Sequence, residues 1–95
     1  MSTLINRTET LGQLIRAVRI AQGLTRDELA NASGFSPKFI SHVEAGKATA
    51  QFGRVLQLLG ELGIRLQAEP STQVPPEALK AASRRRRSSG RTPDA

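Results

Sequence analysis

The chain has no cysteine, tyrosine or tryptophan, and it contains one histidine and three phenylalanines among 95 residues. Without cysteine, neither a disulfide nor a cysteine-based zinc site can stabilise the core, and one histidine is too few for a metal site. The lack of tyrosine and tryptophan argues against an RNA-binding surface made of stacked aromatic rings. We therefore expect a small domain that is held together by apolar packing and needs no cofactor.

Long apolar runs are also missing. No stretch approaches the roughly 18 consecutive apolar residues that a membrane-spanning helix needs. The opening stretch, MSTLINRTETLG, does not have the apolar run of a signal peptide. The length of 95 residues suggests one domain at most. We expect a soluble, cytoplasmic protein with no membrane partner.

Groups that could perform catalysis are scarce. The only histidine, His42, directly follows Ser41, and neighbouring residues of a helix do not face one another. No acidic residue is placed to orient the imidazole toward a nucleophile. We therefore predict that the protein is not an enzyme.

Basic residues outnumber acidic ones, and the formal net charge is +6. Residues 1–69 carry eight Lys or Arg and six Asp or Glu, whereas residues 70–95 carry six and two. Most of the basic excess therefore lies near the end of the chain. A basic chain favours polyanions such as nucleic acid, although such a charge can also serve solubility alone.

Two amphipathic segments flank the middle of the chain. The first has a predicted start at Thr10, which can form a capping box with Gln13, and a predicted stop at Gly23. The second has a predicted start at Thr49 and a stop at Gly63. Apolar residues recur at helical spacing in both segments: Leu11, Leu14, Ile15 and Val18 in the first, and Phe52, Val55, Leu56, Leu59 and Leu62 in the second.

Between them, residues 25–46 read TRDELANASGFSPKFISHVEAG, which predicts two short helices joined by a turn. Thr25 and Glu28 form a capping box for the first of these helices, and Gly34 allows the turn. Ser36 can cap the second, with Pro37 at the first helical position, where a missing N–H costs nothing. Three apolar side chains anchor the second helix to the core: Phe35, Ile40 and Val43. This is the helix-turn-helix pattern.

A helix anchored in this way presents its N-terminus and outer face, which fit the major groove of DNA. Ser36, Pro37 and Lys38 are placed at its tip, and Ser41 and His42 lie about one turn further along. Lys38 can donate to guanine, whereas Pro37 can offer only an apolar contact. On an ordinary surface helix the same residues would form a solvated face. The preceding turn favours the DNA interpretation.

The sequence resembles the lambda-repressor-like helix-turn-helix family, also called XRE or Cro/C1-type, over about residues 10–62. The matching residues are Thr25, Glu28, Leu29, Ala30, Gly34, Ser36, Ile40, Ser41, Glu44 and Gly46. The resemblance implies a mainly α fold of four to five helices and a sequence-specific transcriptional repressor that binds DNA. Such a protein would be associated with the nucleoid.

The resemblance also implies roles for individual residues. Arg19 and Glu44 would form a structural ion pair between the first helix of the domain and the second helix of the helix-turn-helix, which is the recognition helix. Base contacts carry over onto Pro37, Lys38 and His42, with Ser41 nearby. Phosphate contacts carry over onto Thr25, Arg26, Lys47 and Thr49. Arg26 stands where many members have Gln, and Pro37 stands where a polar base reader is common, so the base preference does not carry over.

After Gly63 the apolar period changes. The stretch IRLQAE, residues 64–69, alternates apolar and polar residues, which predicts a strand. A lone strand leaves its backbone unpaired, so we expect Ile64, Arg65, Leu66, Gln67 and Ala68 to pair with the same residues of a second copy. The alternative is a frayed, extended segment. Gly53 and Gly60 fit close approach of a second helix, or are simply tolerated.

A helix followed directly by a strand, in FGRVLQLLGELGIRLQAE, resembles the HipB-type antitoxins. The resemblance implies a homodimer on a palindromic operator, a kinase-like HipA toxin as partner, and repression of the module's own promoter. The alternatives are a stand-alone or phage-type repressor without a toxin, and a toxin-neutralising interaction module with vestigial DNA binding.

From Pro70 the apolar pattern ends. We therefore expect an N-terminal arm over residues 1–9, a DNA-binding and dimerisation domain over residues 10–69, and a disordered basic tail over residues 70–95. Within that tail, residues 76–83 could form a transient helix. The run Arg84–Arg87 could add nonspecific DNA or RNA affinity, contact a partner, or remain solvated.

Overall fold

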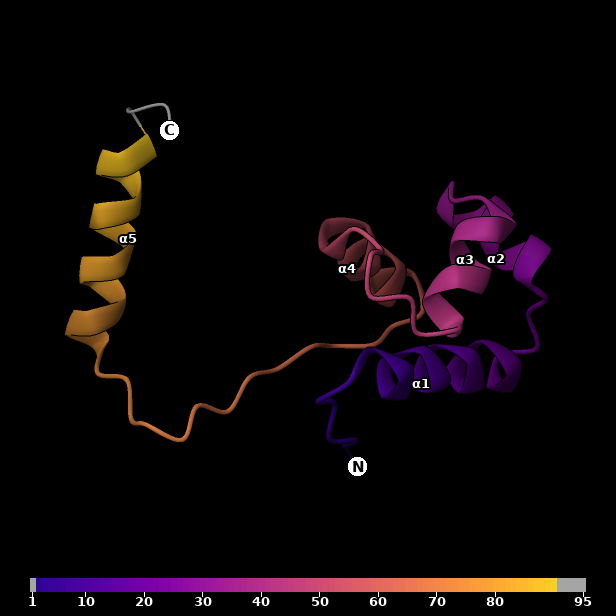
Figure 1. Cartoon of the computed structure of the whole chain (residues 1–95), viewed down its shortest axis with the longest axis horizontal. Helices are drawn as coiled ribbons and strands as arrows, with labels where there is room; N and C mark the ends of the chain where they lie inside the picture. Colours follow the sequence, from indigo (N-terminus) through magenta and orange to yellow (C-terminus); the bar gives the residue numbers. More distant parts are fainter. Residues whose placement is uncertain (1, 91–95) are drawn as a thin grey trace.

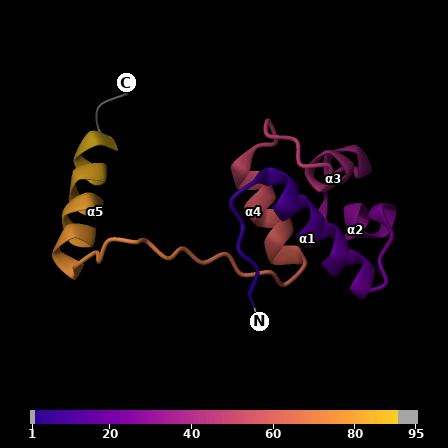
Figure 2. The ribbon, with the colours of Figure 1, turned by 60° about the horizontal axis from the view of Figure 1, so that its bottom comes forward.

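The computed structural model describes the backbone of residues 2–90 and the side chains of residues 2–84. Its elements are five helices: α1 (Thr8–Ala21), α2 (Arg26–Ser33), α3 (Pro37–Glu44), α4 (Phe52–Glu61) and α5 (Pro76–Gly90). Helices α1 to α4 gather into one body, and α5 stands apart at the end of an extended segment (Figures 1 and 2). None of the helices in the described part of the chain is long and apolar enough to cross a membrane.

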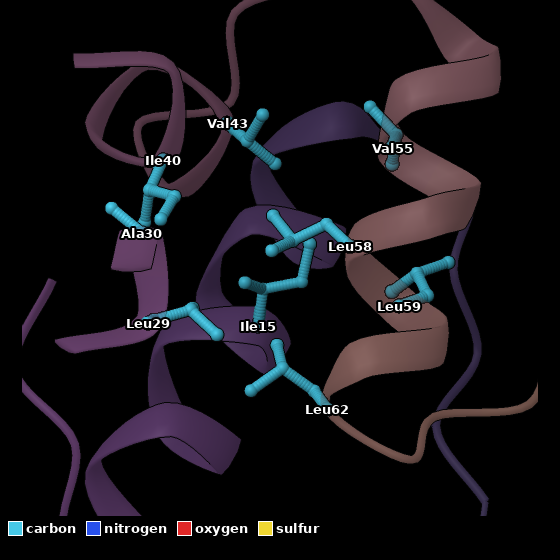
Figure 3. Packing of buried hydrophobic residues seen from close by; sticks show 9 residues of the cluster. All are labelled: Ile15, Leu29, Ala30, Ile40, Val43, Val55, Leu58, Leu59 and Leu62. Carbon is cyan, nitrogen blue, oxygen red and sulfur yellow. The ribbon is translucent and has the colours of Figure 1, made fainter. Parts of the chain in front are cut away.

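The core lies where the four helices of the body meet (Figure 3). Its largest fully buried side chains are Ile15, Leu29, Ile40, Leu58 and Leu59. Each of these helices buries one apolar stripe of an amphipathic sequence, so all four are needed to complete a core of this size. The predicted mainly α fold is therefore confirmed.

The two predicted helix starts outside the helix-turn-helix are wrong. Helix α1 begins at Thr8, inside the predicted N-terminal arm, and Thr10 lies within the helix instead of capping it. The Thr8 hydroxyl instead donates to the carbonyl oxygen of Gly46 at 2.7 Å. Helix α4 begins at Phe52 and not at Thr49, and its N-cap residue, Gln51, makes no side-chain capping bond. A side-chain cap contributes only about 1 kcal/mol, so a helix can begin where no such cap is present, as both of these helices do.

The predicted apolar stripe of α4 was partly wrong. Leu58, which the prediction left out, is fully buried, whereas Phe52 is 64% exposed and Leu56 is 41% exposed. The body meets α4 along the face that carries Val55, Leu58, Leu59 and Leu62. The apolar face of α4 is therefore wider than the core needs.

The predicted strand does not form in the single chain. Residues 64–69 are extended but carry no strand, and no segment of the described backbone forms one. A strand requires a hydrogen-bonded neighbour, and one chain offers this segment none. The body ends at a turn through Gly63, where the Ile64 amide donates to the Leu59 carbonyl oxygen at 2.9 Å.

Within residues 70–95, which were predicted to be disordered with a possible transient helix over residues 76–83, the structure has helix α5 over Pro76–Gly90. The helix therefore begins where the transient helix was predicted and extends beyond it. Locally, the segment begins with Pro76, has Glu77 in its first turn, and continues with strong helix formers. Residues 91–95 of the predicted tail lie outside the described residues.

Candidate nucleic-acid interface

Local hydrogen bonds define both helices of the predicted motif. The Thr25 hydroxyl accepts from the Glu28 amide at 3.0 Å, and the Glu28 carboxylate accepts from the Thr25 amide at 2.8 Å. The Ser36 hydroxyl accepts from the Phe39 amide at 3.0 Å, with Pro37 as the first residue of α3. The predicted capping box and the predicted Ser36 cap are thus confirmed.

The turn between α2 and α3 requires a left-handed residue, which Gly34 supplies with φ of 81°. Its amide donates to the carbonyl oxygen of Ala30 at 2.9 Å and closes α2. Phe35 then packs against Phe39, with the ring centroids 4.8 Å apart. These contacts fix the angle at which α3 leaves the turn.

Helix α3 has one buried face and one open face. Ile40 and Val43 are buried in the core. Ser36, Pro37 and Lys38 are exposed, and Ser41 and His42 are half-buried. The tip and outer face of α3 are therefore accessible to a large ligand.

Hollows flank α3 on two sides and divide between them the predicted contact residues other than Ser36. One side joins α3 to the start of α2, and its lining is Arg19, Leu24, Thr25, Arg26, Asp27, Pro37, Lys38 and Ser41. The other joins α3 to the loop before α4, and its lining is Phe39, His42, Lys47, Thr49, Ala50, Gln51 and Arg54. The structure thus brings Lys38 and Ser41 together with Arg26, and His42 together with Lys47.

Arg54 was missed in the sequence analysis. It lies in the first turn of α4 and lines the same hollow as His42 and Lys47. The sequence signal for Arg54 was an arginine near the start of the helix that follows the loop after α3. It was overlooked because the helix start had been predicted at Thr49.

A buried carboxylate lies behind α3. Glu44, whose side chain is 2% exposed, accepts from Arg19 Nε at 2.6 Å and from Arg19 Nη2 at 3.2 Å. Arg19 Nη1 also donates to the carbonyl oxygen of Leu24 at 2.8 Å. The two-point contact with Glu44 connects α1 to the end of α3, and the bond to Leu24 connects α1 to the loop before α2.

The same carboxylate has a second cationic partner that the sequence analysis did not foresee. Arg26 Nε donates to Glu44 Oε1 at 3.0 Å, and the Arg26 side chain is 44% exposed. Its Nη nitrogens donate to no acceptor among the described residues. Glu44 therefore holds Arg26 at one nitrogen and leaves the outer nitrogens available beside Lys38.

Close backbone contact also positions α3. A Cβ at Gly12 would lie 2.5 Å from the Val43 carbonyl oxygen and 2.6 Å from that of Glu44. Only glycine permits this approach between α1 and the end of α3. Gly12 is an internal helical residue, so local propensity gave no sign of this role.

Comparison with known proteins agrees with this geometry. A family model described as a helix-turn-helix domain matches residues 10–68. An HTH-type transcriptional regulator, y4mF of Sinorhizobium fredii, is 48% identical over 63 residues, which are 66% of this chain and 83% of that protein.

Solved structures extend the comparison. A HipB–O4 20mer complex matches with a TM-score of 0.67 at 21% identity, over 75% of this chain and all of that chain. A HipA–HipB–O2–O3 complex matches with a TM-score of 0.68 at 21% identity, with the same coverage. The restriction-modification controller protein C.AhdI of Aeromonas hydrophila has a TM-score of 0.55 at 31% identity, over 61% of this chain and 88% of that one. The chain belongs to the helix-turn-helix domain family, in its XRE-like branch, and has the fold of HipB.

Proposed function

We propose that the protein is a sequence-specific DNA-binding transcriptional repressor that recognises a palindromic operator as a homodimer. The single observation that carries this proposal is the division of α3 into a locked inner face and an accessible outer face. An α-helix offered in this way matches the width of the major groove.

Base recognition is assigned to the open side of α3. Lys38 donates to guanine O6 or N7, Ser41 and His42 hydrogen-bond to base edges or phosphates, and Pro37 contacts a thymine methyl group. Ser36 lies at the tip and brings the N-terminus of α3 toward the duplex.

Phosphate contacts are assigned to the two sides of α3. Thr25 and Arg26 lie on one side, and Lys47 and Thr49 on the other, where Arg54 adds a further positive charge. Contacts of this kind orient the domain on the duplex without reading its sequence. Among these cations, Arg26 is bound to a carboxylate of the body, because its Nε donates to Glu44 Oε1 at 3.0 Å.

Dimerisation follows from the need to read two half-sites. Two copies bound to successive major grooves on one side of the duplex would read half-sites about 10 base pairs apart. The extended segment from Ile64 to Ala68, which lacks a partner in one chain, would pair with its counterpart in the second copy.

The finer proposal is that the protein is the antitoxin of a HipBA-like module and binds a kinase-like toxin. Similarity to the HipB chain of a HipA–HipB complex supports it. Copurification with the product of a neighbouring kinase-like gene would support this partner. A neighbourhood of phage genes, with no such product, would favour a stand-alone repressor.

The test of DNA recognition begins with selection of a preferred duplex from a randomised pool. The double variant Lys38→Ala, His42→Ala should then bind the selected duplex at least about tenfold more weakly in a gel-shift assay. Sedimentation should show its oligomeric state unchanged. Arg16→Ala, on the exposed side of α1, is the matched control, because it also removes a cation. Equal binding by the double variant and the wild type would overturn the assignment.

A further inference from the structure

The cations on the two sides of α3 differ in their partners. On one side, two arginines donate to the buried carboxylate of Glu44, each through its Nε, at 2.6 Å and 3.0 Å. On the other side, the hollow before α4 is lined by a basic cluster that consists of His42, Lys47 and Arg54. None of these three forms an ion pair among residues 2–84. The basic cluster therefore has charge that the body does not neutralise.

The hollow of the basic cluster contains no acidic side chain. Its other lining residues are Phe39, Thr49, Ala50 and Gln51. The Thr49 hydroxyl can donate a hydrogen bond. Helix α4 begins at Phe52, so its N-terminus adds partial positive charge to that of the side chains. The hollow is therefore suited to an anion.

The acidic residues of the helices around the hollow lie elsewhere. Glu44 of α3 is bound by two arginines, and Glu9 of α1 pairs with the arginine two positions before it. In α2, Asp27 lines the hollow on the other side of α3, and Glu28 belongs to the capping box. Glu61 is the last residue of α4. None of the five lines the hollow of the basic cluster.

His42 is the one member of the basic cluster whose charge varies near neutral pH. An imidazole changes charge between about pH 5 and 8, whereas lysine and arginine stay charged throughout that range. The two permanent cations attract a phosphate to the hollow. A phosphate within about 4–6 Å of an imidazole favours its protonated form, because opposite charges stabilise one another. Phosphate binding and protonation of His42 therefore favour each other.

We propose that the basic cluster holds one DNA phosphate and that His42 takes up a proton from solvent when it does so. His42 then donates an N–H to a phosphate oxygen as an imidazolium and does not read a base edge. Base reading is left to the residues on the other side of α3, which are Pro37, Lys38 and Ser41. This inference rests on the proposed function, which brings the outer face of α3 to DNA and allows His42 either kind of contact.

The test is the affinity of the full chain for the selected duplex between pH 6 and pH 8, measured by fluorescence anisotropy at constant ionic strength. Wild-type affinity should fall at least about tenfold from pH 6 to pH 8, because each copy in the dimer loses one bound proton. His42→Gln, which is neutral throughout, should match the wild type within about twofold at pH 8 and bind about tenfold more weakly at pH 6. The chain has one histidine and no cysteine. The amino terminus also titrates in this range, but both proteins share it.

Two further variants complete the test. His42→Arg keeps a cation at every pH and should retain the wild-type pH 6 affinity across the range. Lys38→Ala, which changes the hollow on the other side of α3, is the matched control. It should bind more weakly but keep the wild-type pH dependence. A pH-independent wild type, or a His42→Gln variant with the wild-type pH dependence, would overturn the proposal. Circular dichroism at pH 6 and pH 8 establishes that each variant is folded.

A duplex of unrelated sequence distinguishes a phosphate contact from a base contact. At pH 6, His42→Gln should lower the affinity for the selected and the unrelated duplex by the same factor, because phosphate contacts do not depend on sequence. A loss confined to the selected duplex would mean that His42 reads a base, and would contradict the proposal.

The same measurements separate this inference from the proposed function. If the wild type selects a duplex but binds it equally at pH 6 and pH 8, only the assignment of His42 is wrong. If the wild type selects no sequence but binds any duplex more tightly at pH 6, and His42→Gln abolishes the difference, the basic cluster stands and the proposed function fails.

Discussion

The four-helix body and the C-terminal segment from Ile64 to Gly90 differ in how they place individual arginines. In the body, Arg19 and Arg26 are both held by Glu44, at 2.6 Å and 3.0 Å. In the C-terminal segment, Arg84 is exposed on α5 and makes no hydrogen bond among the described residues. A guanidinium that is bound to a carboxylate can meet a phosphate in a fixed geometry, whereas an exposed one attracts phosphate through its charge alone.

The two regions also differ in how their helices are stabilised. Each helix of the body contributes buried residues to one core. Helix α5 stands away from that core (Figure 1), and Leu79 on it is 62% exposed. Helix α5 therefore depends on local propensity, which is weak for a helix of 15 residues in water. Changes at buried residues of the body should therefore alter stability, and changes on α5 should not.

The largest expected effect comes from Glu44→Ala. The Arg19 side chain, which is 9% exposed, would remain buried without a carboxylate. We expect the free energy of unfolding to fall by about 3–5 kcal/mol. Urea unfolding followed by circular dichroism measures this, since the chain has no tryptophan or tyrosine for fluorescence. Glu77→Ala, at an exposed position of α5, is the control, and a loss as small as that of the control would contradict the role of Glu44.

The next largest effect is expected for Gly12→Ala. The added Cβ would meet the carbonyl oxygens of Val43 and Glu44 at 2.5 and 2.6 Å, so the backbones must separate. We expect a loss of about 1–3 kcal/mol in the same unfolding experiment. Gln13→Ala, at the exposed next position, should leave the stability nearly unchanged. Stabilisation by Gly12→Ala would mean that α1 and α3 are further apart than the structure has them.

A smaller effect, on DNA affinity, is expected to distinguish Arg26, which is bound to Glu44, from Arg84, which is exposed on α5. Arg26→Lys keeps the charge but loses the fork that can bind Glu44 and a phosphate together. We expect affinity for the selected duplex to fall about tenfold, the equivalent of about 1.4 kcal/mol. Arg84→Lys should bind like the wild type, because only charge matters there. Equal binding by both variants would remove the distinction between the two regions.

The smallest effect on stability is expected for removal of residues 70–95. No core residue lies among residues 70–84, the part of this range whose side chains are described, so the free energy of unfolding should change by less than about 0.5 kcal/mol. The dependence of DNA affinity on salt should become less steep, because the removed residues include six Lys or Arg. An unchanged salt slope would show that the C-terminal segment does not contact phosphate.

Sequence analysis succeeded where local chemistry decides the structure. The Thr25–Glu28 capping box, the Ser36 cap and the turn at Gly34 depend on residues a few positions apart, and all three form as predicted. It was less successful at the starts of α1 and α4, where neither N-cap residue makes a side-chain capping bond. For the interface, the exposed tip of α3 could be predicted, but the link between Glu44 and Arg26 could not.

Composition and short-range spacing alone were enough to define a small, cysteine-free, helical protein with two capped helices around a tight turn. These features arise from hydrogen bonds and backbone preferences within a few residues of one another. Only the folded chain decided that Leu58, and not Leu56, enters the core, and that Arg26 meets Glu44, 18 positions away. Such pairings depend on how whole helices pack, and the spacing of residues within one helix does not contain that information.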